Sequence, residues 1–137
     1  MHIREYTDAD LASLRALHAA QRMPYAFPDL SNPLFLTRLV AQSEDGRAIS
    51  AVFLRLTAEA YFLLDPTAGT PRDRWRALLL LHEAARGDAN RRGLDDAHAW
   101  LPPQVARAFG RRIERLGWSR EPWPCYSRSI AAPTPFL

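Results

Sequence analysis

The most regular pattern of apolar and polar positions lies between residues 60 and 101, where it predicts a strand, a long helix and a second strand. Ala60–Asp65 is a short apolar run that a proline stops. The helix begins near Pro71, because the fixed φ of proline suits a first helical turn. Its apolar side chains recur every three or four residues: Trp75, Leu78, Leu79, His82, Ala85 and Ala89. Asp95–Leu101 is the second strand, so this segment predicts a parallel βαβ unit.

The N-terminal part of the chain predicts one strand and two helices. His2–Tyr6 alternates as a strand does, and Thr7–Asp10 offers a cap of the threonine-x-x-acid type to the helix that follows. Ser31–Pro33 supplies an N-cap and a first-turn proline for a second helix. Four apolar side chains of this second helix are expected to be buried: Phe35, Leu36, Leu39 and Val40.

The remaining elements are two strands and a C-terminal helix. Arg47–Thr57 is apolar on both faces, as a central strand is, and a tight connection predicts that it pairs antiparallel with Ala60–Asp65. A helix follows Pro102 and ends at Gly117. Prolines interrupt the segment Trp118–Ile130, which predicts a broken hairpin that ends in an edge strand.

Together these elements predict a single α/β domain over residues 1–130, followed by a tail over residues 131–137. The expected sheet is mixed, antiparallel at first and parallel across the central helix, with helices on both faces. The chain has 137 residues, of which 47% are apolar and 24% charged, and this composition is typical of a globular protein rather than a disordered one.

The charge pattern excludes some chemistry and favours little. All eighteen basic residues are arginine, and the formal net charge is +3. The absence of lysine excludes Schiff-base catalysis by lysine and a P-loop lysine. Arginine suits bidentate recognition of phosphate or carboxylate, but coding bias also explains a chain without lysine. The basic balance alone is weak evidence for nucleic acid, which we rank last among the partners.

Cysteine and hydropathy set further bounds. Cys125 is the only cysteine, so no intrachain disulfide can form, and no cysteine–histidine spacing resembles a zinc site. No metal is expected. No apolar run approaches membrane-spanning length, and Met1–Tyr6 has no signal-sequence pattern, so no membrane contact is expected and the cytoplasm is the default location.

The start of the central helix is the first candidate binding site. Free N–H groups and the helix dipole favour an anion at a helix N-terminus, and here the first two turns also carry Arg72, Arg74 and Arg76. Two interpretations stay open: a site for a phosphate-bearing ligand, or three arginines that only solvate an exposed helix end.

The predicted order of elements resembles that of the GNAT (N-acetyltransferase) superfamily. Three segments carry the resemblance: the opening Ile3–Leu11, the apolar-x-proline ending Leu64–Pro66, and the late helix Phe109–Trp118 with its Leu-Gly-Trp end. The likeness covers residues 3 to 130 and is one of pattern. It implies a transferase that moves acetyl from acetyl-coenzyme A to an amine of a small molecule or a protein.

The resemblance also implies roles for particular residues. The backbone at Leu63 and Leu64 would hold the acetyl arm, and the three arginines would hold the pyrophosphate. Superfamily members have glycines in the loop before the long helix, whereas this chain has Pro71, Asp73 and Trp75 at or near those positions. Proline cannot donate a backbone hydrogen bond, and side chains in this loop would crowd a phosphate bound by the backbone. The resemblance therefore implies coenzyme A binding, whereas the residues of this loop count against it.

No catalytic acid carries over, because Ile113 stands where many members have a tyrosine. The remaining candidates are Glu59 as a base and Tyr126 as an acid, each of which could equally be a surface or packing residue. His98 on the second strand could titrate usefully but has no partner in the sequence pattern. The alternative function is a GNAT-like module without catalysis, which could form a homodimer through the predicted hairpin with Trp123 as an anchor.

Overall fold

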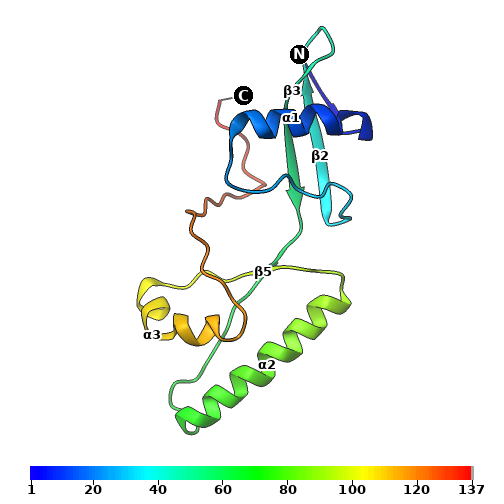
Figure 1. The fold of residues 1–137 in the computed structure, drawn as a ribbon. Helices are drawn as coiled ribbons and strands as arrows, with labels where there is room; N and C mark the ends of the chain where they lie inside the picture. The colour runs from blue at the N-terminus through cyan, green and yellow to red at the C-terminus, as the bar shows by residue number, and fades with distance from the viewer. Residues whose placement is uncertain (137) are drawn as a thin grey trace. The chain divides into compact units, whose positions relative to one another are not determined.

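A computed structural model describes residues 1–136 (Figure 1) and divides into two compact units, the first from Met1 to Ala99 and the second from Trp100 onward. The first unit contains a three-stranded antiparallel sheet, two helices and a small parallel strand pair, and the second contains one helix. The α/β class is therefore confirmed. The predicted single domain over residues 1–130, the tail and the placement of helices on both sheet faces stay predictions. None of the helices described is long and apolar enough to cross a membrane.

The antiparallel sheet has the strand order β1 (His2–Glu5), β2 (Phe35–Gln42), β3 (Ala48–Arg55). β2 is central: Val40 lies opposite Arg4 of β1 on one side and Ala51 of β3 on the other. A tight turn joins β2 to β3, where Gly46 takes the positive φ of 88° that favours glycine. The register puts alternate β2 residues on one face of the sheet, with Val40 completely buried there.

The predicted second helix after Ser31–Pro33 is wrong, since this segment turns directly into β2. The side chain of Asn32 accepts from the N–H of Leu34 at 2.9 Å, and its carbonyl accepts from Phe35 at 3.1 Å. These bonds close a turn instead of capping a helix. Apolar residues at 35, 36, 39 and 40 fit one face of a helix, but they equally fit a central strand whose two faces are both apolar.

One face of this sheet packs against helix α1 (Leu11–Gln21), which contacts β3. The small core consists of the buried side chains of Leu14, Leu30 and Val40. Next to it, the Phe53 ring lies edge-on to Tyr6 and to Phe35, with centroids 6.1 and 6.3 Å apart. The other face of the sheet carries the apolar side chains of Ile3, Val52 and Leu54, each of which is at least half-exposed.

A partly buried ion pair joins the sheet to the start of α1. Arg4 of β1 donates two hydrogen bonds to the carboxylate of Asp10, at 2.7 and 2.8 Å. Asp10 ends a short 3-10 turn (Asp8–Asp10) that leads into α1, and its carboxylate also accepts from the N–H of Thr7 at 2.9 Å. The predicted threonine-x-x-acid cap is thus confirmed. The bond from Arg4 outweighs the desolvation of this buried carboxyl, so the pKa of Asp10 lies well below its usual range.

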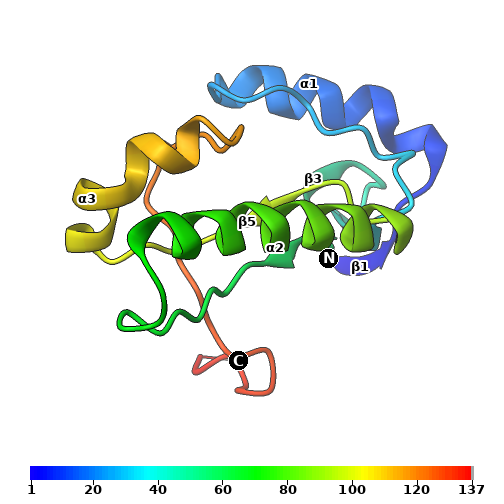
Figure 2. The same ribbon diagram turned by 90° about the horizontal axis from the view of Figure 1, so that it is seen from below.

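A parallel βαβ unit is present as predicted in type, but its strands are short and the first of them precedes the predicted Ala60–Asp65. β4 (Ala58–Glu59) pairs in parallel with β5 (Ala97–His98), and α2 (Pro71–Arg91) connects them (Figure 2). The N–H of Ala60 still reaches the carbonyl of His98 at 2.8 Å. Beyond this bond the two chain segments have no ladder.

The predicted strand Ala60–Asp65 and its antiparallel pairing with Arg47–Thr57 are therefore wrong. Side chains at residues 61–70 are all exposed, so no packing against a neighbouring strand stabilises an extended ladder there. The carboxylate of Asp65 instead accepts from the N–H of Thr67 at 2.8 Å, which closes a local turn. The predicted second strand, Asp95–Leu101, likewise shortens to β5.

The second unit is organised by α3 (Pro103–Glu114), which starts at a proline as predicted. Gly117, at φ 96°, ends the helical stretch, and the N–H of Trp118 folds back toward the carbonyl of Ile113 at 3.4 Å. The predicted hairpin over Trp118–Ile130 is wrong, because the described part of this segment contains no strand. Its two prolines lack the N–H groups that a ladder needs.

The ion pair between Arg4 and Asp10 makes a direct prediction for stability. Asp10→Asn leaves the guanidinium without its anion, so we expect the free energy of unfolding at pH 7 to fall by about 1 to 3 kcal/mol in urea denaturation. Glu83→Gln, which breaks an exposed pair with Arg86, is the matched control and should change nothing measurable.

The same pair predicts a pH dependence of stability. Since the folded-state pKa of Asp10 is lowered, its contribution is fully present above the unfolded value of about 3.9 and is lost as the pH falls below it. The difference between wild type and Asp10→Asn should therefore shrink steadily below about pH 4. A difference that stays constant down to pH 2 would contradict this assignment.

Candidate functional site

Three titratable side chains meet at the β4–β5 pair. Glu59 of β4 lies directly opposite His98 of β5 in the parallel register, and residues in register point to the same face of a sheet. Tyr61 follows two residues after Glu59, and its hydroxyl donates to the Glu59 Oε1 at 2.6 Å. Glu59 and Tyr61 are exposed, whereas His98 is half-buried. A carboxylate, a phenol and an imidazole are thus available to the same ligand.

The protonation of Tyr61 follows from this contact. The hydrogen bond to the Glu59 carboxylate and the negative charge of that carboxylate both raise the pKa of Tyr61, because an ionised phenol there would face another anion. Tyr61 therefore keeps its proton at neutral pH and holds Glu59 in place.

The start of α2 carries its own anion. Thr70 is the N-cap, and the Asp73 carboxylate accepts from the Thr70 N–H at 2.9 Å and from its hydroxyl at 2.7 Å. In return the Thr70 hydroxyl accepts from the Asp73 N–H at 3.1 Å. These bonds lower the pKa of Asp73. The carboxylate therefore already occupies the position near the helix N-terminus where the dipole favours negative charge.

The three predicted arginines differ in what they do. Arg74 donates to the carbonyls of Ala68 and Gly69, at 3.1 and 3.0 Å, and so closes the turn before the helix. Arg72 and Arg76 are exposed and make no ion pair within residues 1–136. Being four residues apart, they share one face of α2 about 6 Å apart along its axis. Two of the three arginines can therefore hold an external anion, and one has a structural contact.

The other predicted residues lie apart from this cluster or in open chain. Leu63 is 93% exposed and Leu64 half-exposed, and their backbone groups make no hydrogen bond among the described residues. Tyr126, which is 94% exposed, lies in the second unit outside any helix or strand. Of the predicted catalytic candidates, only Glu59 meets other titratable groups.

The sequence pattern did not indicate Tyr61, and it gave His98 no partner. The spacing Glu-x-Tyr could have indicated the first contact, because alternate side chains of an extended segment point the same way. The pairing of Glu59 with His98 depends on the register of two strands whose partners are thirty-nine positions apart, which no local pattern contains. No group of three or more histidine, cysteine, aspartate or glutamate side chains in the described chain could hold a metal ion.

The hydrogen bond between Tyr61 and Glu59 is testable by titration. In Glu59→Gln the amide carries no charge, so the pKa of Tyr61 should fall back toward the ordinary value for tyrosine. Ultraviolet difference absorbance across alkaline pH measures the ionisation, and Tyr61→Phe identifies which part of the signal belongs to this residue. An identical titration in wild type and Glu59→Gln would show that the contact is absent in solution.

Comparisons with family models, with curated proteins and with solved structures gave no match to this chain. A functional proposal therefore has to come from the residues and their geometry.

Proposed function

We propose that this chain is an acyltransferase that moves acetyl from acetyl-coenzyme A to an amine. The observation that carries the proposal is the parallel β4–β5 pair. There Glu59 lies in register with His98 and accepts a hydrogen bond from Tyr61, and the ladder ends directly afterwards. The open segment after Ala60 leaves the backbone donors and acceptors of Leu63 and Leu64 free for an extended ligand arm.

The order of elements supports the same proposal. Three antiparallel strands are followed by a parallel pair that a 21-residue helix connects, and a further helix comes after the second strand of that pair. This order resembles the GNAT superfamily, but the antiparallel pair expected before the long helix is missing, because β3 and β4 lie in separate sheets. A resemblance in fold adds support to the acyltransferase proposal, but function has to be argued from the site itself.

The proposed chemistry asks the protein mainly for positioning and proton transfer. Acetyl-coenzyme A would supply an activated thioester. An attacking amine must lose a proton as the new C–N bond forms, and Glu59 or His98 would accept that proton. The C–S bond breaks at the same time, and coenzyme A would leave as a thiolate that takes a proton from solvent. Tyr61 orients the Glu59 carboxylate through its hydrogen bond. Arg72 and Arg76 would bind the pyrophosphate by charge-assisted hydrogen bonds.

A second candidate is a binding module that has no catalytic activity. The capping of α2 favours it, because the Asp73 carboxylate occupies the helix N-terminus and repels a phosphate that approaches the same N–H groups. In this case Glu59, Tyr61 and His98 are an exposed polar cluster without a substrate.

Isothermal titration with acetyl-coenzyme A separates the two candidates. If the acyltransferase proposal holds, the wild-type chain binds, and Arg72→Gln with Arg76→Gln weakens binding by at least about tenfold. The matched control replaces Arg86 of α2 and Arg92, which follows the helix directly, by glutamine, because these arginines are already paired with Glu83 and Asp88. The control should bind as wild type does, although both double variants remove two charges. No binding heat from the wild type would overturn the proposal in favour of the second candidate.

Asp73→Asn gives an independent prediction about the same site. The substitution removes the negative charge and keeps an amide oxygen that can still accept from Thr70. Because the helix N-terminus then lacks its own anion, acetyl-coenzyme A should bind several-fold more tightly than to wild type, while the helix cap becomes weaker. Equal or lower affinity in the variant would show that the phosphate groups do not approach this helix end.

A further inference from the structure

The two units differ sharply in charge. Residues 1–99 contain twelve arginines and thirteen acidic residues, a formal charge of −1. Residues 100–137 contain six arginines and two glutamates, a formal charge of +4. The modest net charge of the whole chain therefore hides a basic C-terminal unit. Such asymmetry along a chain is a physical sign of an anionic partner for the basic part.

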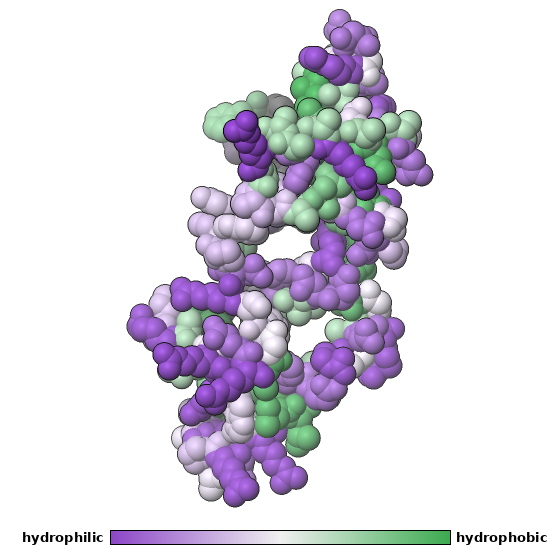
Figure 3. All heavy atoms as spheres, in the orientation of Figure 1, coloured by the Kyte–Doolittle hydropathy of each residue, from purple (hydrophilic) through white to green (hydrophobic). Residues whose placement is uncertain are grey.

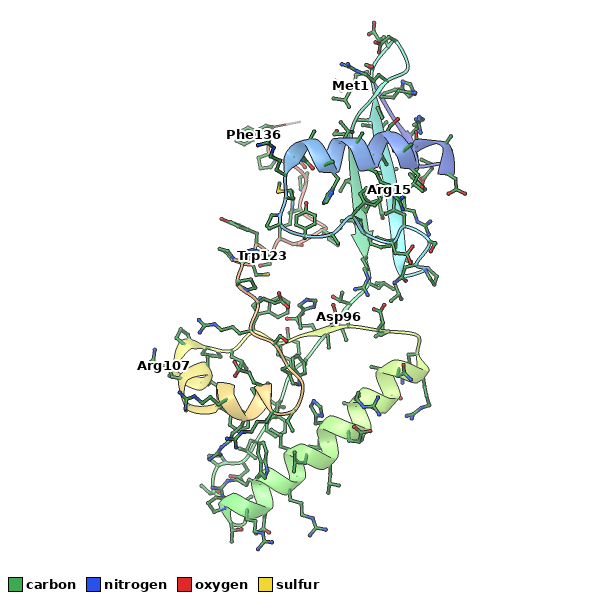
Figure 4. The ribbon with its side chains drawn as sticks, in the orientation of Figure 1. Met1, Arg15, Asp96, Arg107, Trp123 and Phe136 are labelled. Carbon is green, nitrogen blue, oxygen red and sulfur yellow. The ribbon has the colours of Figure 1, made fainter. Side chains whose placement is uncertain are left out.

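Three of these arginines form a stripe on α3. Arg107, Arg111 and Arg115 follow one another at four-residue spacing, and Arg115, directly after the helix, keeps helical angles of −65° and −20°. The stripe therefore runs about 12 Å along the helix axis. All three are exposed, and Arg107 projects outward from the helix (Figure 4). The visible face at α3 is strongly hydrophilic (Figure 3).

The opposite side of α3 is apolar and only partly shielded from solvent. It consists of Val105, Phe109, Ile113 and Leu116. Val105 is exposed, and the other three side chains are half-buried. The arginine stripe is the more exposed side of the helix, so an approaching partner meets the charges first.

The stripe has no acidic partner. Within the described chain, Arg107, Arg111 and Arg115 make no ion pair, whereas α2 pairs its corresponding residues locally. There Arg86 contacts Glu83, and Arg91 and Arg92 contact Asp88. Glu114 shares this side of the helix and lowers its net charge to +2. Three arginines in a row still favour a ligand with several anionic groups over a single small anion.

Exposed aromatic rings in the same unit narrow the class of partner. Tyr126 is 94% exposed and Trp123 55% exposed, and both follow α3 in the chain. Unpaired bases stack on such rings, and arginines track the phosphate backbone beside them. A nucleic-acid strand carries one phosphate charge every few ångströms, so it can contact all three arginines of a 12 Å stripe at once.

We propose that the unit beginning at Trp100 binds single-stranded nucleic acid, with the α3 stripe on the phosphates and Trp123 and Tyr126 on the bases. The proposal is independent of the acyltransferase proposal, since it uses none of the residues at the β4–β5 pair. It concerns binding without sequence selection, because phosphate contacts and stacking carry no base code.

Fluorescence anisotropy with the full chain and a labelled oligonucleotide of about 20 nucleotides, as DNA and as RNA, tests this proposal. The wild type should bind at about 50 mM salt, with the logarithm of affinity falling linearly as the logarithm of salt rises. The triple variant Arg107→Gln, Arg111→Gln, Arg115→Gln should lose at least about tenfold in affinity and reduce the salt slope by about 2. Circular dichroism checks that α3 still forms.

The matched control is Arg86→Gln, Arg91→Gln, Arg92→Gln, which removes the same charge from arginines that are already paired. Its affinity should stay within about twofold of wild type. An equal loss of affinity in both triple variants would show only a general effect of net charge and would overturn the assignment of the phosphate contacts to the α3 stripe. Absence of wild-type binding at low salt would overturn the proposal altogether, as would binding to phosphatidylserine vesicles without binding to either oligonucleotide.

The aromatic contribution has its own test. Trp123→Ala with Tyr126→Ala should weaken binding of the single strand by about tenfold and leave the salt slope unchanged, since stacking releases no counterions. A duplex of the same sequence should bind more weakly than the single strand. Tighter binding of the duplex, or no effect of the aromatic substitutions, would overturn the assignment to single strands.

Discussion

The N-terminal half of this protein depends on a charged group held away from water. The Asp10 carboxylate is buried, and it is stable there only because Arg4 and the Thr7 backbone satisfy it together. Arg4 also donates to the side chain of Gln42 at 3.1 Å, so one guanidinium connects β1, β2 and the start of α1. Among the described residues the apolar core is small, since only Leu14, Leu30 and Val40 are buried, so this ion pair is a large share of what fixes α1 on the sheet.

The same kind of interaction has a different meaning at α2. Asp10 and Asp73 both cap a helical segment three residues after a threonine, yet one is buried with an arginine and the other is exposed at a helix end. The first contributes to folding. The second decides whether a ligand with phosphate groups can use the helix N-terminus, so it is the residue on which the two functional candidates differ most.

Local signals in the sequence predicted the ends of elements well, whereas strand partners could not be predicted. Pro71 and Gly117 were placed correctly, because proline geometry and a positive φ are properties of one residue. The apolar spacing from Phe35 onward fits a helix and a central strand equally, and only pairing with β1 and β3 decides between them. In the same way the sequence points to Glu59 but not to its neighbour His98, because the two are paired only through strand register.

The shortness of the β4–β5 pair has a consequence for motion. Two residues on each side close a chain segment of nearly forty residues, and loop closure of this length costs entropy that so short a ladder offsets only weakly. This part should open locally far more often than the three-stranded sheet, in the way that amide hydrogen exchange distinguishes independently opening segments of one protein. A ligand that bridges β4 and β5 would therefore spend part of its binding free energy on ordering the chain, and its affinity and the local protection of these amides would rise and fall together.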